Sequence, residues 1–321
     1  MTRNRTALVL GATGGIGGEM ARRLASSGWA VRALHRRPAE ASRATGPESG
    51  ISWVQGDAMR ASDVAAAAEG AGLIVHAVNP PGYRKWEELV LPMLDSSIQA
   101  ARANGARILL PGTVYNYGPD AFPLIDEDAP QNPGTRKGRI RVEMERRLRV
   151  AAGQGPRVLI VRAGDFFGPQ AANNWFSQGL VKPGRPVATI TNPGRCGIGH
   201  QWAYLPDVAE TMVRLVDRGD ALPDFASFHM GGHWDADGTA MANAIRDAVP
   251  GRKPKIRAFP WRLVRLASPV VPLFRELGEM RYLWERPVRL DNSRLVAALG
   301  EEPHTPLAEA VRTTLSGLRS I

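Results

Sequence analysis

Two cations four residues apart, Lys137 and Arg141, lie in a segment whose pattern predicts a helix over residues 135–148. At about 100° per residue they share a face with the apolar side chains of Met144 and Leu148. Charged side chains usually lie opposite the apolar face, and like charges at this spacing repel. An ammonium group can exchange a proton, whereas a guanidinium keeps its charge. The pair is therefore a candidate for a site that needs proton transfer and a fixed positive charge.

Residues 6–10 form an apolar run that is typical of a strand. The spacing of the glycines that follow it indicates a site for a phosphate-bearing cofactor. Gly11, Gly14 and Gly17 follow this run directly and open a helical pattern. Glycines let the backbone approach a pyrophosphate, and a helix N-terminus supplies amide donors. This strand–turn–helix context favours a dinucleotide. The predicted cofactor-binding residues of this loop are Gly11, Thr13, Gly14, Gly15, Ile16 and Gly17.

The end of the second predicted strand indicates which dinucleotide binds. NAD sites commonly place an acidic residue there to hold the ribose hydroxyls. This chain instead has His35, Arg36 and Arg37 at that point. A guanidinium can hold a 2′-phosphate with charge-assisted hydrogen bonds, which a carboxylate would oppose. The predicted cofactor is NADP(H), with NAD(H) as the alternative.

Apolar runs alternate with helical patterns through the first half of the chain. The predicted strands cover residues 6–10, 30–34, 51–55, 73–78, 107–110 and 157–161, and a long helix covers 86–104. This alternation predicts an α/β fold with a doubly wound parallel sheet, a Rossmann fold, and a smaller C-terminal substrate-binding lobe. We expect residues 1–169 to form the dinucleotide-binding domain, with 203–220 returning to it. Residues 170–202 and 221–321 form mainly the substrate lobe, and Asp207 is a candidate helix cap.

Composition sets limits on the class of protein. The chain has 321 residues, a net charge of +10 and one cysteine, which excludes an internal disulfide and a multi-thiolate metal site. No apolar stretch reaches the roughly 20 residues that span a bilayer, so we expect a soluble, cytoplasmic protein. We also expect no bound metal. Because the arginines are spread along the chain, we predict no nucleic-acid partner. Residues 252–289 mix cations with tryptophans, and we expect a lobe with apolar residues packed inward, although peripheral membrane association is an alternative.

Several further segments make the chain resemble the extended, epimerase/dehydratase-like branch of the short-chain dehydrogenase/reductase superfamily. The matching segments are 11–17, 56–58, 75–81, 161–169, 204–210 and 290–300, although Leu10 stands where threonine is usual. The resemblance implies cofactor contacts from Asp57 and Ala58, from Ala77, Val78 and Asn79, and from Ala163 and Gly164. It also implies a homodimer formed through the helices near 86–104 and 135–150.

The match fails at the catalytic centre of that branch. The branch uses a serine or threonine after the fifth strand, then a tyrosine, and a lysine four residues beyond it. Thr113 takes the hydroxyl position, but Lys137 stands where the tyrosine belongs and Arg141 where the lysine belongs. The resemblance implies that Lys137 exchanges the proton and also contacts the cofactor, while Arg141 holds the nicotinamide ribose. Tyr115, two residues after Thr113, is a second candidate for the missing phenol.

The second lobe offers candidate substrate contacts. Asn173, Asn174 and Trp175 follow the sixth predicted strand, and His200 and Trp202 precede the helix near Asp207. Strand-end topology would bring both groups toward the mouth of a ligand cleft. Aromatic side chains at these positions suit a flat or partly apolar substrate better than a free sugar.

Three functions follow from these features. The first is an NADP(H)-dependent oxidoreductase acting on a carbonyl or polarised double bond of a small molecule. The second is a non-catalytic protein that binds NADP(H) as a redox sensor or regulator. The third is a nucleotide-sugar epimerase or dehydratase, although Val114 and Tyr115 do not supply the paired acids of the dehydratases and the tyrosine base of the epimerases is missing from its place.

Overall fold

The structure, a computed structural model, describes residues 5–80, 85–171 and 174–321. The chain divides into two compact units, each built from several segments. The first unit comprises Met1–Asn116, Arg136–Arg162 and Ala209–Phe228, and the second comprises Tyr117–Thr135, Ala163–Val208 and His229–Ile321. Residues 117–135, assigned above to the first domain, therefore pack within the second unit. The cofactor and substrate roles given to the two domains stay predictions.

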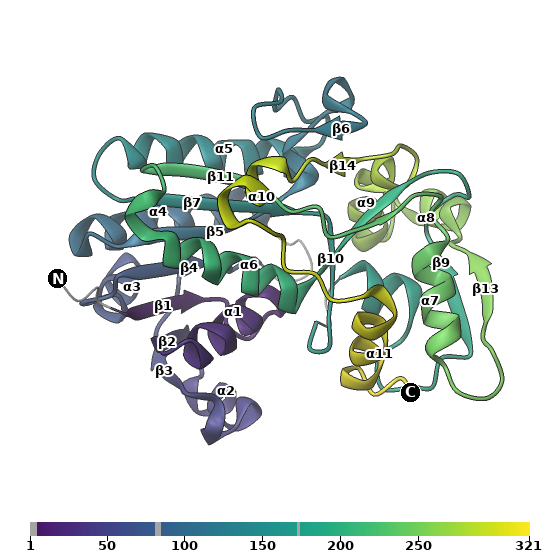
Figure 1. Cartoon of the computed structure of the whole chain (residues 1–321), viewed down its shortest axis with the longest axis horizontal. Coiled ribbons are helices and arrows are strands. Elements are labelled where there is room, and N and C mark those ends of the chain that lie inside the picture. The colour runs from purple at the N-terminus through teal and green to yellow at the C-terminus, as the bar shows by residue number, and fades with distance from the viewer. Residues whose placement is uncertain (1–4, 81–84, 172–173) are drawn as a thin grey trace. The chain divides into compact units, whose positions relative to one another are not determined.

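The first unit is built on a seven-stranded sheet (Figure 1). Its strands, in spatial order, are β11 (Phe225–His229), β7 (Val158–Ala163), β5 (Arg107–Thr113), β4 (Leu73–His76), β1 (Thr6–Leu10), β2 (Ala30–His35) and β3 (Ile51–Gln55). β1 pairs in parallel with both β2 and β4, and the pairs β2–β3 and β4–β5 are parallel as well. The strand order reverses between β1 and β4, and ligands of doubly wound folds bind at the carboxyl ends of the strands at such a point. The predicted Rossmann-type α/β fold is confirmed.

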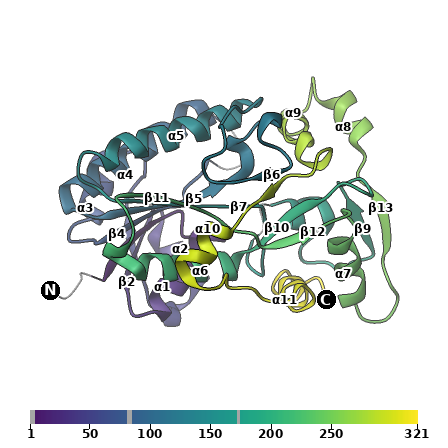
Figure 2. The ribbon, with the colours of Figure 1, turned by 45° about the horizontal axis from the view of Figure 1, so that its top comes forward.

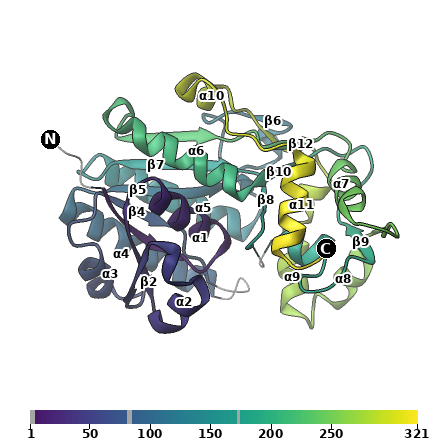
Figure 3. The same cartoon turned by 60° about the horizontal axis from the view of Figure 1, so that its bottom comes forward.

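Helices cover both faces of this sheet. They are α1 (Gly15–Ser26), α2 (Pro38–Thr45), α3 (Ala61–Ala67), α4 (Trp86–Asn104), α5 (Arg136–Ala152) and α6 (Leu205–Arg218). α3, α4 and α5 lie on one face, and α1 and α6 lie on the other (Figures 2 and 3). Leu8, Ile74 and Ile108 from the strands form one fully buried cluster with Leu94 of α4 and Met144 of α5. The central strands β1 and β4 are almost continuously apolar and buried because helices cover the sheet on both faces.

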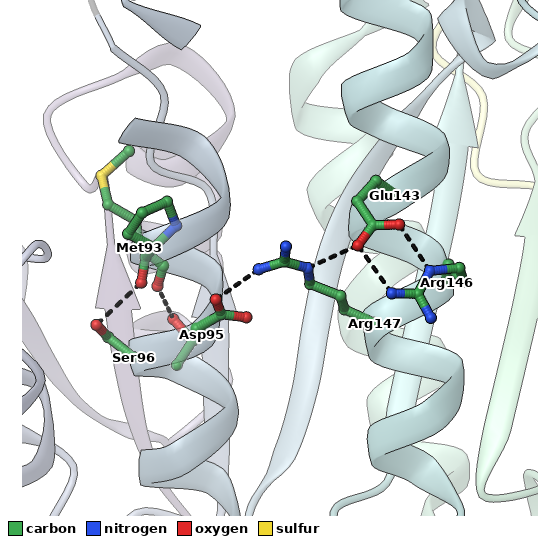
Figure 4. Close-up of polar contacts among 8 residues, drawn as sticks. Met93, Asp95, Ser96, Glu143, Arg146 and Arg147 are labelled. Atoms are coloured by element: carbon green, nitrogen blue, oxygen red, sulfur yellow. Dashed lines mark hydrogen bonds and ion pairs between the residues drawn. The ribbon is translucent and has the colours of Figure 1, made fainter. Parts of the chain in front are cut away.

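Ion pairs on the outer surface join α5 to α4 (Figure 4). Glu143 accepts hydrogen bonds from Nε of Arg146 at 2.6 Å and from Nε of Arg147 at 2.8 Å. Arg147 also reaches Asp95 of α4 at 2.5 Å. The hydrogen bonds from Arg146 and Arg147 lower the pKa of Glu143 to about 2. These bonds supplement the apolar contact between the two helices.

A groove of about 300 Å³ runs between the last turns of α4 and α5. Its lining residues are Asp95, Ile98, Gln99, Arg102, Arg146, Arg147, Val150 and Ala151. In parallel folds each helix begins near the carboxyl end of the strand before it, so the last turns of the helix lie near the amino ends of the strands. The groove is therefore separate from the crevice at the ends of β1 and β4.

The second unit contains three small sheets and, among the α-helices of its described residues, α7 to α11. Its strands are β6 (Leu124–Ile125), β8 (Asp165–Phe167), β9 (Thr189–Asn192), β10 (His200–Tyr204), β12 (His233–Asp235), β13 (Lys255–Ala258) and β14 (Arg289–Leu290). Its helices are α7 (Ala240–Ala248), α8 (Trp261–Ala267), α9 (Pro272–Glu279), α10 (Ser293–Leu299) and α11 (Leu307–Gly317). Its own core is rich in aromatic side chains, including Phe167, Trp175, Trp202 and Trp284.

One helix differs from its prediction. Asp207 was expected to cap the helix that follows it, but α6 already begins at Leu205. The Asp207 carboxylate instead accepts hydrogen bonds from the backbone N and Oγ1 of Thr305, both at 2.7 Å. No helix in the described part of the chain is long and apolar enough to cross a bilayer.

Candidate functional site

The glycine loop after β1 packs so closely that Gly11 and Gly17 leave no room for a side chain. Gly11 has a φ of +88°, and a Cβ on it would lie 2.5 Å from the carbonyl oxygen of Ala77, which follows β4. A Cβ on Gly17 would lie 2.2 Å from the carbonyl oxygen of Gly11. The amide of Gly14 donates to that same oxygen at 2.9 Å, which closes the turn. The loop is therefore pressed against the end of β4, at the reversal of strand order.

The opening of α1 is suited to an anionic group. Thr13 and Gly14 are exposed, Gly15 and Ile16 are half-buried, and the first turn carries no acidic side chain. The first amides of a helix have no acceptor within it and form the positive end of its dipole. This cradle of amides and small residues fits the pyrophosphate of a dinucleotide.

Two arginines follow β2, and only one of them is paired. Arg37 makes an ion pair of 3.0 Å with Glu40 in α2. Arg36 is exposed and makes no hydrogen bond or ion pair within the described ranges. His35 lies against Trp53 with its ring centroid 5.9 Å away, so its side chain is held at the end of the strand. Of the two guanidinium groups, that of Arg37 is therefore neutralised by an acid of the described chain and that of Arg36 is not.

The segment after β3 forms a fixed turn. The amide of Asp57 donates to Oδ2 of Asp63 at 2.9 Å, and Oδ1 of Asp57 accepts from the amide of Met59 at 3.0 Å. Ala58 between them is half-buried. These bonds hold the two residues predicted to contact the adenine in one conformation.

The inward face of α5 carries two cations, Lys137 and Arg141. Lys137 is 1% exposed and Arg141 is 8% exposed, and both share that face with the fully buried Met144 and Leu148. The prediction that both cations turn inward is confirmed. Burying charged groups is costly unless they are paired, so this face is built around polar contacts.

Arg141 joins α5 to the loop after β4. Its guanidinium donates to Oδ1 of Asn79 at 3.1 Å and lies over the ring of Trp86, 5.3 Å from the centroid. Asn79 is exposed, while Ala77 and Val78 before it are half-buried. Pro81, the last residue of the matching segment, lies outside the described residues. One of the predicted cofactor positions, Asn79, is thus held beside Arg141.

The hydroxyl candidates at the end of β5 also lie against α5. Oγ1 of Thr113 accepts from the amide of Tyr115 at 3.1 Å, so its hydrogen is left to donate elsewhere. The turn Val114–Asn116 packs directly on α5, and the side chain of Tyr115 is half-buried. The first unit therefore brings together the glycine loop, the loop after β4, the turn after β5 and the cationic face of α5.

Two polar pairs beside this site were not found from the sequence. His76, the last residue of β4, bonds through Nδ1 to Oγ of Ser97 at 2.8 Å. Burial, and then the charge of Arg141, lowers the pKa of His76 to about 3, so the ring is neutral. The signal for this pair in the sequence was His76 itself, the one polar residue that ends the apolar run of β4.

The second missed pair is ionic. Arg162 of β7 is 0% exposed and donates through Nε to Glu145 of α5 at 2.9 Å, and its terminal nitrogen bonds the other carboxylate oxygen at 2.5 Å. Glu145 lies four residues after Arg141 and so on the same helix face. The four-residue spacing of Arg141 and Glu145 was the signal in the sequence that placed Glu145 on the inward face.

The remaining cofactor candidates lie at the end of β7. Ala163 is the last residue of the strand and is buried. A Cβ on Gly164 would lie 2.2 Å from the carbonyl oxygen of Gln201, so close backbone packing accounts for the glycine. Their contact with a cofactor stays a prediction.

The substrate candidates lie within the second unit, and Asn173 lies outside the described residues. Asn174 accepts from the amide of Ser177 at 2.8 Å and donates to Ala171 at 3.0 Å, as a capping residue does. Trp175 and Trp202 are 8% and 2% exposed. Their role in binding a substrate stays a prediction.

His200 is held from both sides. Its Nε2 lies 2.9 Å from Oδ2 of Asp165, its Nδ1 lies 3.2 Å from the carbonyl oxygen of Leu283, and Trp284 stacks on it at 3.7 Å between centroids. Because a carbonyl oxygen only accepts, Nδ1 of His200 is the donor in its contact with Leu283. The structure thus gives His200 a structural partner on each ring nitrogen.

A family model agrees with the fold and with the glycine loop. The chain belongs to the NAD dependent epimerase/dehydratase family, whose model matches residues 7–231. That span covers β1 to the start of the second unit's last segment, and it includes every loop of the site described above. The family resemblance drawn from the sequence motifs is confirmed.

Known relatives support the fold more than the activity. The chain is 29% identical over 199 residues to the uncharacterized protein y4nL of Sinorhizobium fredii, and it spans 55% of that protein's length. Among solved structures it is similar to MoeE5 in complex with UDP-glucuronic acid and NAD (TM-score 0.74, 18% identity, 98% and 99% of the two chains). It is also similar to the UDP-glucuronic acid 4-epimerase of Bacillus cereus with NAD (TM-score 0.75, 15% identity, 98% of each chain).

Proposed function

We propose that this protein is an NADP(H)-dependent oxidoreductase that acts on a carbonyl or polarised double bond of a small molecule. The observation that carries the proposal is the inward face of α5, which buries both Lys137 and Arg141. The sequence resemblance aligns these two residues with the family's tyrosine and lysine. Arg141 is bonded to the loop after β4, and the turn that carries Thr113 packs on the same helix. A cationic face at this position suits proton transfer and cofactor binding.

The residues divide the chemistry as follows. The reduced nicotinamide, when bound, supplies a hydride to the electrophilic carbon of the substrate. Lys137 gives a proton from Nζ to the substrate oxygen, which becomes a hydroxyl, and the resulting amine takes a proton from water. Thr113 donates a hydrogen bond to the same oxygen. Arg141, which cannot give up its proton, holds the nicotinamide ribose together with Asn79.

A comparison of variants tests the role of Lys137. We expect Lys137→Met to lower turnover by about 10²–10⁴-fold, as loss of a general acid does, with little change in NADPH affinity. Lys137→Tyr restores the family's residue and should keep part of the activity. Arg139→Met is the control, because this exposed cation lies on the same helix but on another face. A large fall in melting temperature with unchanged turnover per folded molecule would make Lys137 a structural cation and overturn the assignment.

The preference for NADP(H) rests on Arg36. We expect NADPH to bind at least about tenfold more tightly than NADH, a difference of about 1.4 kcal/mol. Arg36→Ala should remove most of this preference, and Arg37→Ala should remove less, because Glu40 already neutralises Arg37. Arg43→Ala, an exposed cation further along α2, serves as the control. Equal affinities of the unmodified protein for the two cofactors would refute the preference.

A nucleotide-sugar epimerase is the second candidate, and the similar structures favour it. MoeE5 and the Bacillus cereus epimerase are both described with NAD and UDP-sugar chemistry. Against it stands the lysine where such enzymes carry a tyrosine base. Incubation with UDP-glucuronic acid or UDP-glucose and NAD separates the two candidates. An epimer formed without net cofactor reduction supports the epimerase, and stoichiometric NADPH consumption by a carbonyl substrate supports the oxidoreductase.

A further inference from the structure

The most exposed apolar side chains of the described chain gather around α8 in the second unit. Leu263 and Leu266, one turn apart on this helix, are 64% and 74% exposed, and Val270 in the turn that follows is 80% exposed. Ile256 of β13, with 37% exposed, belongs to the same stretch. The expectation that the apolar residues of this region all pack inward is therefore wrong for these four.

The helix is nevertheless firmly seated. Val264 is 4% exposed, and Trp261 packs on the aromatic core and donates through Nε1 to the carbonyl oxygen of Pro193 at 2.9 Å. The outward leucines are thus presented by an anchored helix, because its opposite face is already buried. Binding through them needs no folding of this segment.

Positively charged residues flank these apolar residues along the chain. Residues 252–275 contain seven lysines and arginines and no aspartate or glutamate. Lys255, Arg257, Arg262 and Arg265 are exposed and make no ion pair within the described part of the chain. Glu285 pairs with Arg281 at 2.7 Å, and Asp247 with Arg246 at 3.5 Å. Glu276 and Glu279 of α9, which packs on α8, are half-buried and have interactions of their own.

We propose that this face, formed by β13, α8 and Val270, binds the surface of an anionic phospholipid bilayer. The leucines and Val270 enter the boundary between headgroups and acyl chains, and the flanking arginines contact lipid phosphates, as in interfacial amphipathic helices. A polynucleotide would satisfy the arginines but not the exposed leucines. An apolar protein surface would satisfy the leucines but would leave the arginines without anionic partners.

Vesicle sedimentation of the full chain tests this proposal. We expect the protein to sediment with vesicles of phosphatidylcholine and phosphatidylglycerol but not with phosphatidylcholine alone, and added salt should weaken the binding. The double variants Leu263→Ser/Leu266→Ser and Arg262→Gln/Arg265→Gln should each bind at least about tenfold less. The controls are Leu124→Ser, which changes another exposed leucine of the second unit, and Arg312→Gln on α11.

Several results would overturn the proposal. Equal binding to both vesicle types, or binding that the α8 variants leave unchanged, would do so. A second copy as the occupant would appear in light scattering as an oligomer, without lipid, that the leucine variant dissociates. Binding to duplex DNA that depends on the arginines but not on the leucines, with no vesicle binding, would assign the face to a nucleic acid instead.

Discussion

The buried histidine at the end of β4 should make the stability of the first unit depend on pH. His76 is 2% exposed, and its pKa is lowered from 6.5 to about 3, first because burial removes the hydration of the charged ring and then because Arg141 repels it. Between these values the unfolded chain binds a proton that the native chain does not. The free energy of unfolding should therefore fall as the pH drops below 6.5, by about 1.4 kcal/mol per pH unit. At pH 5 this amounts to about 2 kcal/mol relative to pH 8.

Urea unfolding at pH 8 and pH 5, followed by both far-UV circular dichroism and tryptophan fluorescence, measures this quantity where the two probes coincide. His233 also has its pKa lowered, to about 4, so the unmodified protein reports both groups together. His76→Asn keeps a hydrogen-bonding partner for Ser97 but does not titrate. Its unfolding free energy should change less between the two pH values, by about 2 kcal/mol. Parallel pH dependences for the two proteins would refute the assignment of a neutral, buried His76.

Three further changes have expected outcomes. Gly11→Ala should abolish dinucleotide binding in a fluorescence titration, because the added Cβ would collide with the loop after β4. Gly105→Ala is the control: Gly105 also has a positive φ but faces open space, so this change should only cost about 1 kcal/mol of stability. Glu145→Ala should cost about 3–5 kcal/mol in urea unfolding, because it removes the carboxylate that holds the buried Arg162, and Glu145→Gln should cost less. Thr113→Val should lower turnover while Thr113→Ser retains it, and equal rates would exclude the hydroxyl from the reaction.

The central sheet could be predicted because most of its strands are largely apolar runs bounded by turn residues. β1 and α4 begin and end where the pattern placed them, and Gly105, with a φ of +62°, ends α4 as an open left-handed residue. The edge strand β11 was missed. In its sequence, FASFH, alanine, serine and histidine accompany the two phenylalanines, so local propensity favoured a strand only weakly. Pairing with the sheet decides its structure.

The site was predicted less completely because its polar contacts join distant segments. The types and spacing of Lys137 and Arg141 were visible along one helix, but the partners of Arg141 come from the loop after β4 and the start of α4. The bonds from Asp207 to Thr305 span 98 residues in the same way. Local pattern reports which face a side chain uses. It does not report which residue of another element meets that side chain.

The charged row on the inner face of α5 explains how a Rossmann unit tolerates such residues in its interior. Glu145 is bonded twice to Arg162 of β7, and one turn earlier Arg141 is bonded to Asn79 and lies over Trp86. These directional contacts fix the rotation and axial position of α5 against the sheet more strictly than apolar packing alone. Lys137 lies one further turn toward the helix N-terminus, so the same contacts fix the position of its backbone. The proton transfer proposed for Lys137 would require its side chain to be held within a fraction of an ångström, and the hydrogen bonds of Arg141 and Glu145 give the helix a rigid support of this kind.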